Sequence, residues 1–175
     1  MMRKVSLLLL VLFFLSACTA VPQLSETDEV AIYTAVIEQL YTEDDTFSGT
    51  FQPPDVYILT QTDDRAGDPA NEQSESQTLK TAVQTEITAA LAHLPARIVW
   101  VDDKTAVPID TTTGAVANNG VIITLGNIHS QRNGKIEVSG SIYIASLAAG
   151  GQTYTLEKVN GVWQINGTTG VRWIS

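Results

Sequence analysis

Two Asn-Gly pairs, Asn133-Gly134 and Asn160-Gly161, constrain the fold of this chain more than any other feature. An Asn-Gly pair favours the tight turn that joins two neighbouring antiparallel strands. Apolar and polar residues alternate on both sides of these pairs, which is the pattern of strands with one buried face. The last third of the chain is therefore predicted to be an antiparallel meander, with strands over 121–128, 136–147, 153–159, 162–165 and 171–174.

The same region contains two further turn or kink signals. Ala148 to Gly151 is expected to turn the chain between two strands, and Asn166-Gly167 with Gly170 is expected to form a bulge before the last strand. Residues 121–128 are apolar on both faces, so this strand is predicted to lie in the centre of a sheet.

The residues before the meander predict two helices and two strands. Apolar residues recur at helical spacing from Thr27 to Tyr41, after an N-cap pattern at 25–28. They recur again from Leu79 to Leu94, after a capping box at 74–77. Pro95 ends the second helix, and strands are predicted over 55–60 and 96–101, with turn-rich residues at 102–120. Strand, helix and strand in succession suggest a βαβ unit.

These elements together predict an α+β fold. Two helices are expected to pack on one face of a curved, mostly antiparallel sheet of five to six strands, with one βαβ unit near the N-terminus. The residues from Tyr154 to Ile165 resemble the final hairpin of NTF2-like and cystatin-like secreted domains. This resemblance implies an architecture and no particular chemistry.

The N-terminus has the pattern of a bacterial export signal. Arg3 and Lys4 precede an apolar run from Val5 to Leu15, which is too short to span a membrane as a helix. The sequence Leu15-Ser16-Ala17-Cys18 follows and resembles the lipobox of bacterial lipoproteins. The resemblance implies cleavage between Ala17 and Cys18 and attachment of diacylglycerol to the Cys18 sulfur. An ordinary signal peptide with a free thiol, or a short buried helix, is the alternative.

This resemblance divides the chain into a signal peptide over 1–17, a lipidated tether over 18–25 and one globular domain over 26–175. The protein is then expected to be exported and lipid-anchored, either to the outer face of the cell membrane or to an outer membrane. Acyl chains of palmitate length hold a protein on a membrane essentially permanently. A tether of seven residues reaches roughly 23 Å, so the domain is expected to lie close to the bilayer as a monomer.

Composition excludes several classes of protein. The net charge of −9 gives the chain no electrostatic reason to bind nucleic acid, and it becomes more negative once Arg3 and Lys4 are removed. A single cysteine excludes an intrachain disulfide. Two histidines and that one cysteine are too few for a zinc site, and no cofactor-binding motif is present.

An acidic segment at 61–76 and an Asp pair after the second strand are the only candidates for a metal site. The carboxylates are Asp63, Asp64, Asp68, Asp102 and Asp103. They lack the spacing of a calcium loop, so the main expectation is a solvated loop with turn-forming Asp residues and no metal. The two parallel strands nevertheless place these residues at one edge of the sheet, where α/β proteins tend to bind ligands.

No catalytic constellation is visible in the sequence, and no enzymatic activity is expected. His93 lies near a helix end, where an imidazole complements the helix dipole, and His129 has only a neighbouring serine. Trp100, Trp163 and Trp173 lie on predicted strands and are expected to pack against the sheet.

We therefore expect an envelope lipoprotein with a binding or assembly domain for an unidentified protein or small molecule. Two alternatives remain: a small-ligand carrier with an apolar pocket, and a lipid-anchored enzyme that uses the acidic edge with His129. A contact of about 3.2 Å between His129 and a carboxylate in a hollow would favour the enzyme.

Overall fold

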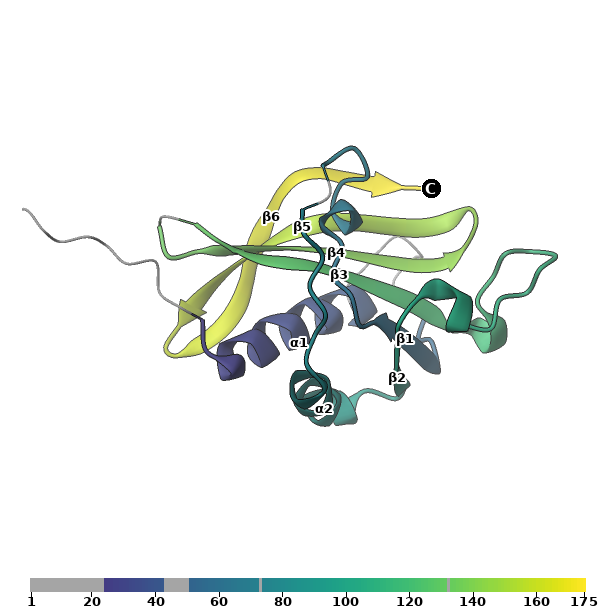
Figure 1. Cartoon of the computed structure of the whole chain (residues 1–175), viewed down its shortest axis with the longest axis horizontal. Helices are drawn as coiled ribbons and strands as arrows, with labels where there is room; N and C mark the ends of the chain where they lie inside the picture. The colour runs from purple at the N-terminus through teal and green to yellow at the C-terminus, as the bar shows by residue number, and fades with distance from the viewer. Residues whose placement is uncertain (1–23, 43–50, 73, 132) are drawn as a thin grey trace, which may run out of the picture.

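The domain is built on one six-stranded sheet in the order β2-β1-β3-β4-β5-β6 (Figure 1). The structure is a computed structural model that describes residues 24–42, 51–72, 74–131 and 133–175, so the predicted signal peptide and Cys18 lie outside the described residues. The strands are β1 Asp55–Leu59, β2 Arg97–Val101, β3 Val121–Ser130, β4 Ile136–Ala145, β5 Ala148–Val159 and β6 Val162–Ile174. The predicted α+β class is confirmed.

The sheet is mixed, because β1 pairs in parallel with both β2 and β3, and the remaining pairs are antiparallel. The predicted βαβ unit is present as β1, helix α2 (Thr81–Ala90) and β2. The Trp100 indole N–H of β2 donates to Thr88 Oγ1 of α2 at 2.9 Å, which fixes the helix across the strand.

Helix α1 (Glu26–Thr42) begins as the sequence predicts. The Asp28 amide donates to Ser25 Oγ at 3.1 Å, and the Ser25 amide donates to Asp28 Oδ2 at 3.2 Å. This reciprocal pair satisfies amide groups that have no partner within the helix.

The predicted capping box at 74–77 is wrong. Helix α2 begins later, at Thr81, and its N-cap Lys80 makes no side-chain cap. Residues 74–79 are instead held in extended form: the Thr62 amide donates to Gln77 O at 2.9 Å and the Leu79 amide to Thr60 O at 2.8 Å. The two serine hydroxyls are used elsewhere, Ser74 on Asp64 and Ser76 on Thr62 O.

Two details of the predicted meander also differ. Residues 148–151 do not turn but belong to β5, because Gly150 and Gly151 pair with Ile142 and Ser141 of β4. The last two predicted strands form the single strand β6, whose pairing with β5 shifts register twice, so the predicted irregularity bends the strand without ending it.

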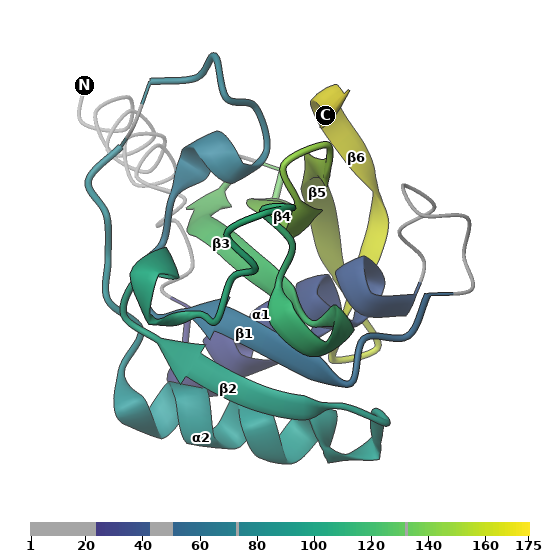
Figure 2. The same cartoon turned by 90° about the vertical axis from the view of Figure 1, so that its right-hand side faces the viewer.

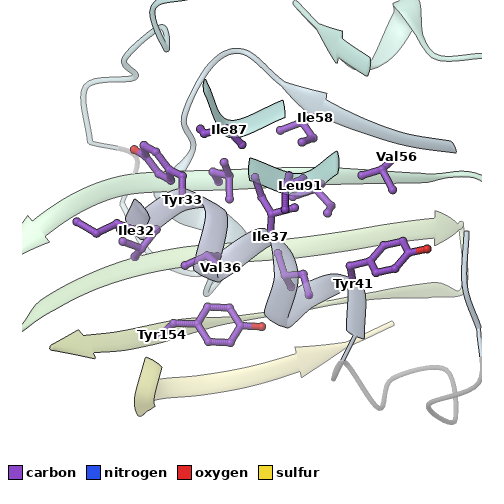
Figure 3. Close-up of a cluster of buried hydrophobic side chains, with 14 of the residues drawn as sticks. Ile32, Tyr33, Val36, Ile37, Tyr41, Val56, Ile58, Ile87, Leu91 and Tyr154 are labelled. Carbon is purple, nitrogen blue, oxygen red and sulfur yellow. The ribbon is translucent and has the colours of Figure 1, made fainter. Parts of the chain in front are cut away.

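Both helices cover the same face of the sheet and lie side by side (Figures 1 and 2). Figure 3 shows the core between them and the sheet, with Ile32, Val36 and Ile37 of α1 near Ile87 of α2 and Tyr154 of β5. These side chains are almost fully buried. The described helix–sheet interface is therefore filled by side chains, which leaves the predicted alternative of an apolar carrier pocket without support there.

Candidate functional site

The site is built where the acidic segment after β1 lies on the sheet face opposite the helices. A short 3₁₀ turn, η3 (Asp64–Ala66), contacts β3, β4 and β5 on that face (Figure 1). The Asp63 amide donates to Leu125 O at 2.8 Å, and the Trp173 indole N–H donates to Ala66 O at 2.9 Å. The segment is thus fixed to the sheet at both ends of the turn.

Two glycines allow this close approach. A Cβ atom added to Gly151 of β5 would lie 2.1 Å from Ala66 O, and one added to Gly126 of β3 would lie 2.8 Å from Asp64 Oδ1. Any other residue at these positions would force the turn away from the sheet. Glycine in the interior of these strands therefore serves to seat η3.

Asp64 is the centre of a buried polar network. Its side chain is 11% exposed and accepts hydrogen bonds from the Asn127 amide at 2.7 Å, from Asn127 Nδ2 at 3.2 Å and from the Ser74 hydroxyl. Burial alone would raise the pKa of Asp64, but these bonds and the contact with His129 outweigh it, so the pKa lies below its usual value. Asp64 is thus a carboxylate at neutral pH.

His129 completes this network from β3. Its Nε2 atom lies 3.1 Å from Asp64 Oδ2, while half of its side chain remains exposed. A buried carboxylate that holds an exposed imidazole fixes the orientation of the ring, as in many hydrolytic sites. The sequence shows only a serine beside His129, whereas the fold supplies a carboxylate partner from 65 residues away.

The Asp64–His129 pair opens into a hollow of about 230 Å³, named here the dyad hollow. Nearly all of its lining side chains carry oxygen or nitrogen atoms. They are Asp64, Asp68, Asn71, His129, Glu137, Ser139, Thr153 and Thr169, with Gly170 and Val171 at one side. The arrangement presents more hydrogen-bond acceptors than donors, since three of these residues are acidic.

The structure divides the five predicted carboxylates between two hollows. Asp64 and Asp68 line the dyad hollow, whereas Asp63, Asp102 and Asp103 line a second hollow of about 490 Å³ at the carboxyl ends of β1 and β2. This second hollow, named the edge hollow, lies where the sequence analysis placed a ligand site.

The carboxylates of the edge hollow have local partners. Arg65 donates to both oxygens of Asp63, at 3.1 and 2.9 Å, Thr60 Oγ1 donates to Asp102 at 3.1 Å, and the Thr105 amide donates to Asp103 at 2.6 Å. These bonds lower the pKa of Asp63 and of Asp103. Mutual repulsion would have raised the pKa values of Asp63 and Asp103, so each of these two carboxylates is satisfied within its own turn.

No metal centre is formed by the part of the chain that the structure describes, where no three Asp, Glu, His or Cys side chains gather as they would around an ion. Asp63 and Asp68 have the expected turn roles, since Asp63 accepts from the Arg65 amide and Asp68 from the Ala70 amide. The expectation of a solvated loop is wrong for Asp64, which is buried.

The remaining singled-out residues have structural contacts. His93 Nδ1 lies 3.0 Å from Ala90 O at the end of α2, and its Nε2 lies 3.2 Å from Glu38. All three tryptophans are half-buried, and the indole N–H of Trp163 donates to Asp28 at 2.7 Å. Trp173 also lines a hollow of about 260 Å³ beside Arg65 and Lys104.

Asn127 and Ser74 are the site residues that sequence analysis missed. Asn127 is a buried polar residue within the apolar strand β3, and it follows Gly126. A Gly-Asn pair in a predicted central strand is the one signal that could have indicated a close backbone approach there. Nothing in the sequence near Ser74 indicates that its hydroxyl bonds to Asp64.

Comparison with known proteins gives no relative from which a role could be transferred. No family model, curated protein or solved structure matches this chain. Neither helix in the described residues has the length and apolar character needed to cross a membrane.

Proposed function

We propose that the protein is an exported lipoprotein, anchored through Cys18, whose domain binds a small hydroxyl-bearing ligand in the dyad hollow. The ligand chemistry that fits best is that of a saccharide. The anchor is supported by the order of basic residues, apolar run and lipobox at 1–18. The binding role is supported mainly by one observation, the Asp64–His129 pair at 3.1 Å inside a polar hollow.

A hydroxyl-bearing ligand matches the lining of this hollow. Each sugar hydroxyl donates one hydrogen bond and accepts others, and the hollow offers carboxylate acceptors beside the hydroxyls of Ser139 and Thr153. The buried Asp64 carboxylate holds the imidazole in one orientation, so His129 does not have to be ordered when the ligand binds. An anionic ligand is disfavoured because Asp68 and Glu137 also face the hollow.

The binding proposal is tested with the full-length lipoprotein in a detergent without a sugar headgroup. Thermal unfolding is followed with a panel of neutral monosaccharides and oligosaccharides, and then with the His129→Gln and Lys80→Ala variants. A stabilising sugar should lose its effect with His129→Gln and keep it with Lys80→Ala, because Lys80 lies outside the hollow. Equal stabilisation of both variants would contradict this site.

An enzymatic role for the same pair is the second candidate, and the 3.1 Å contact between Asp64 and His129 favours it. His129 would act as a general base toward water or a ligand hydroxyl, and Asp64 would orient it. This arrangement differs from the predicted one, because His129 lines the dyad hollow and not the acidic edge. Hydrolysis of nitrophenyl glycosides or esters, abolished by His129→Gln, would replace the non-enzymatic proposal.

The anchor is tested by Cys18→Ala. This variant should neither incorporate a radioactive fatty acid nor partition with membranes. A Ser16→Ala variant keeps a small residue in the lipobox, so it should still incorporate the fatty acid and still partition with membranes. Persistent fatty-acid labelling of Cys18→Ala would contradict the anchor.

A further inference from the structure

One end of the molecule combines the first described residue with two hairpin turns. The start of α1, the β3–β4 connection and the β5–β6 turn all lie at this end, while the β4–β5 turn lies at the other (Figure 1). We name it the tether end and define it by Leu24, Lys135, Val159, Val162 and Trp163. A hollow of about 240 Å³ opens here, with Leu24 and Trp163 in its wall.

Apolar side chains are exposed at the tether end. Val162 is 58% exposed and Val159 is 37% exposed. Both flank a tight turn whose geometry does not require apolar side chains at these two positions. The Trp163 ring is half-buried, and its N–H donates to Asp28 at 2.7 Å. Because its one polar group is already paired, the exposed part of this indole is apolar.

The charges of the tether end are largely paired, although the whole chain is acidic. Lys158 lies 2.6 Å from Asp28, Lys80 lies 3.5 Å from Glu26, and Lys135 lies 3.7 Å from Glu157. Lys158 also lies 5.6 Å from the centre of the Trp163 ring. The tether end therefore repels an anionic bilayer less than the net charge of the protein suggests.

The length of the tether decides which end can reach the membrane. The seven residues from Thr19 to Ser25 span at most roughly 23 Å. The sheet is longer, since the 10 residues of β4 extend roughly 33 Å at the usual rise of a strand. An anchor at Cys18 thus holds the tether end near the bilayer and keeps the opposite end of the sheet away from it.

We propose that the tether end is seated on the lipid bilayer, with Val162 and Trp163 at the membrane–water interface. This inference rests on the proposed anchor at Cys18. Aliphatic and indole side chains are favoured at the interface between headgroups and acyl chains, and Trp is enriched there. Each such contact is weak, but the anchor supplies the high local concentration that makes weak contacts persistent.

Cysteine labelling of the full-length lipoprotein tests this orientation. The chain has one cysteine, so a thioether lipid at Cys18 leaves no free thiol, and an introduced cysteine becomes the only labelled position. Val162→Cys places a fluorophore at the tether end. Leu147→Cys is the matched control, because Leu147 is 88% exposed in the turn between β4 and β5 at the opposite end.

The labelled proteins are inserted into vesicles of phosphatidylcholine and phosphatidylglycerol that contain a lipid with a nitroxide near its headgroup. The label at residue 162 should be quenched several-fold more strongly than the label at residue 147. Val159→Cys provides a second tether-end position if Val162→Cys melts at a lower temperature than the parent. Equal quenching at both ends, or stronger quenching at residue 147, overturns the proposed seating.

Thiol labelling of the wild-type protein distinguishes failure of the proposed seating from failure of the proposed anchor at Cys18. A lipidated Cys18 takes up no thiol reagent, so unequal quenching is interpreted only when the wild type remains unlabelled. Labelling of the wild type at Cys18 would contradict the anchor and, with it, the seating that depends on it. An unlabelled wild type with equal quenching would contradict the seating alone.

Discussion

Asp64 is the residue on which most of the candidate site depends. It joins three parts of the chain that are far apart in sequence: the turn η3, the extended segment at Ser74, and β3 through Asn127 and His129. A buried carboxylate stabilises the fold only while its hydrogen-bond donors are present. If the carboxylate or a donor is removed, the remaining partner is buried without a hydrogen bond, which is costly. The same residue therefore orients His129 and fixes the acidic segment.

The first prediction separates these two roles. Asp64→Asn replaces one carboxylate oxygen by an NH2 donor, which in either orientation of the side-chain amide faces a donor of Asn127, the backbone N–H or Nδ2. We therefore expect a loss of about 2 kcal/mol in the free energy of unfolding. In a domain of this size that lowers the melting temperature by about 6 °C. His129→Gln removes a contact from a half-exposed side chain and should cost less than about 1 kcal/mol. Equal losses for the two variants, measured by thermal unfolding, would contradict this assignment.

At the scale of elements, η3 is held in place by the backbone that it contacts. Gly151→Ala places a methyl group where Ala66 O now lies, so the turn must shift, and we expect a destabilisation of about 2 kcal/mol. Gly167→Ala is the matched control on the neighbouring strand, because its added Cβ would lie 3.4 Å from Thr155 Oγ1, an ordinary contact. Urea unfolding of both variants measures the difference between their stabilities. Similar urea midpoints would contradict the close contact between η3 and Gly151.

The start of α1 carries the second element-scale prediction, which concerns pH. Lys158, Trp163 and Ser25 donate to Asp28 and hold its pKa far below its usual value. A carboxyl with a depressed folded-state pKa stabilises the fold above its unfolded pKa of about 4, and this stabilisation is lost as the pH falls further.

The stability of the wild type should therefore decrease more than that of Asp28→Asn between pH 5 and pH 2. At pH 7 the variant should be the less stable of the two, because the ion pair with Lys158 is lost. Urea midpoints measured across this range give both quantities. Parallel curves for the two proteins would show that Asp28 does not supply the acid sensitivity.

Much of the element order was predictable because it depends on local chemistry. The tight turn at Asn160-Gly161, the alternation in β4 and the cap at Ser25 each involve residues within a few positions of one another. The connection at Asn133-Gly134 is wider than the predicted tight turn, because Gln131 and Lys135 close it by a backbone hydrogen bond. The start of α2 was not predictable, because a distant carboxylate takes up the hydroxyl of Ser74. The Asp64–His129 pair was missed for the same reason, since it forms only when β3 and η3 meet in the fold.

At the scale of the whole molecule, one sheet connects every part of the domain, so we expect a single cooperative unfolding transition. Deleting Val171–Ile174 removes the Trp173 bond to Ala66 and the last pairings with β5. We expect the free energy of unfolding of the whole domain to decrease by about 3 kcal/mol, since a packed tryptophan is lost. Deleting Ser175 alone removes one backbone hydrogen bond and should cost about 1 kcal/mol. Calorimetry that shows two transitions would contradict this cooperativity.

The strand order places β6 at one edge of the sheet, where its outer backbone groups face solvent. A long, regular edge strand is a template for pairing with another chain, and so for aggregation. The two register shifts in β6, together with the left-handed backbone at Gly170, break this edge into short pieces. The opposite edge, β2, is only five residues long. A second copy of the chain therefore finds no long, regular edge in the described sheet along which to add its own strand.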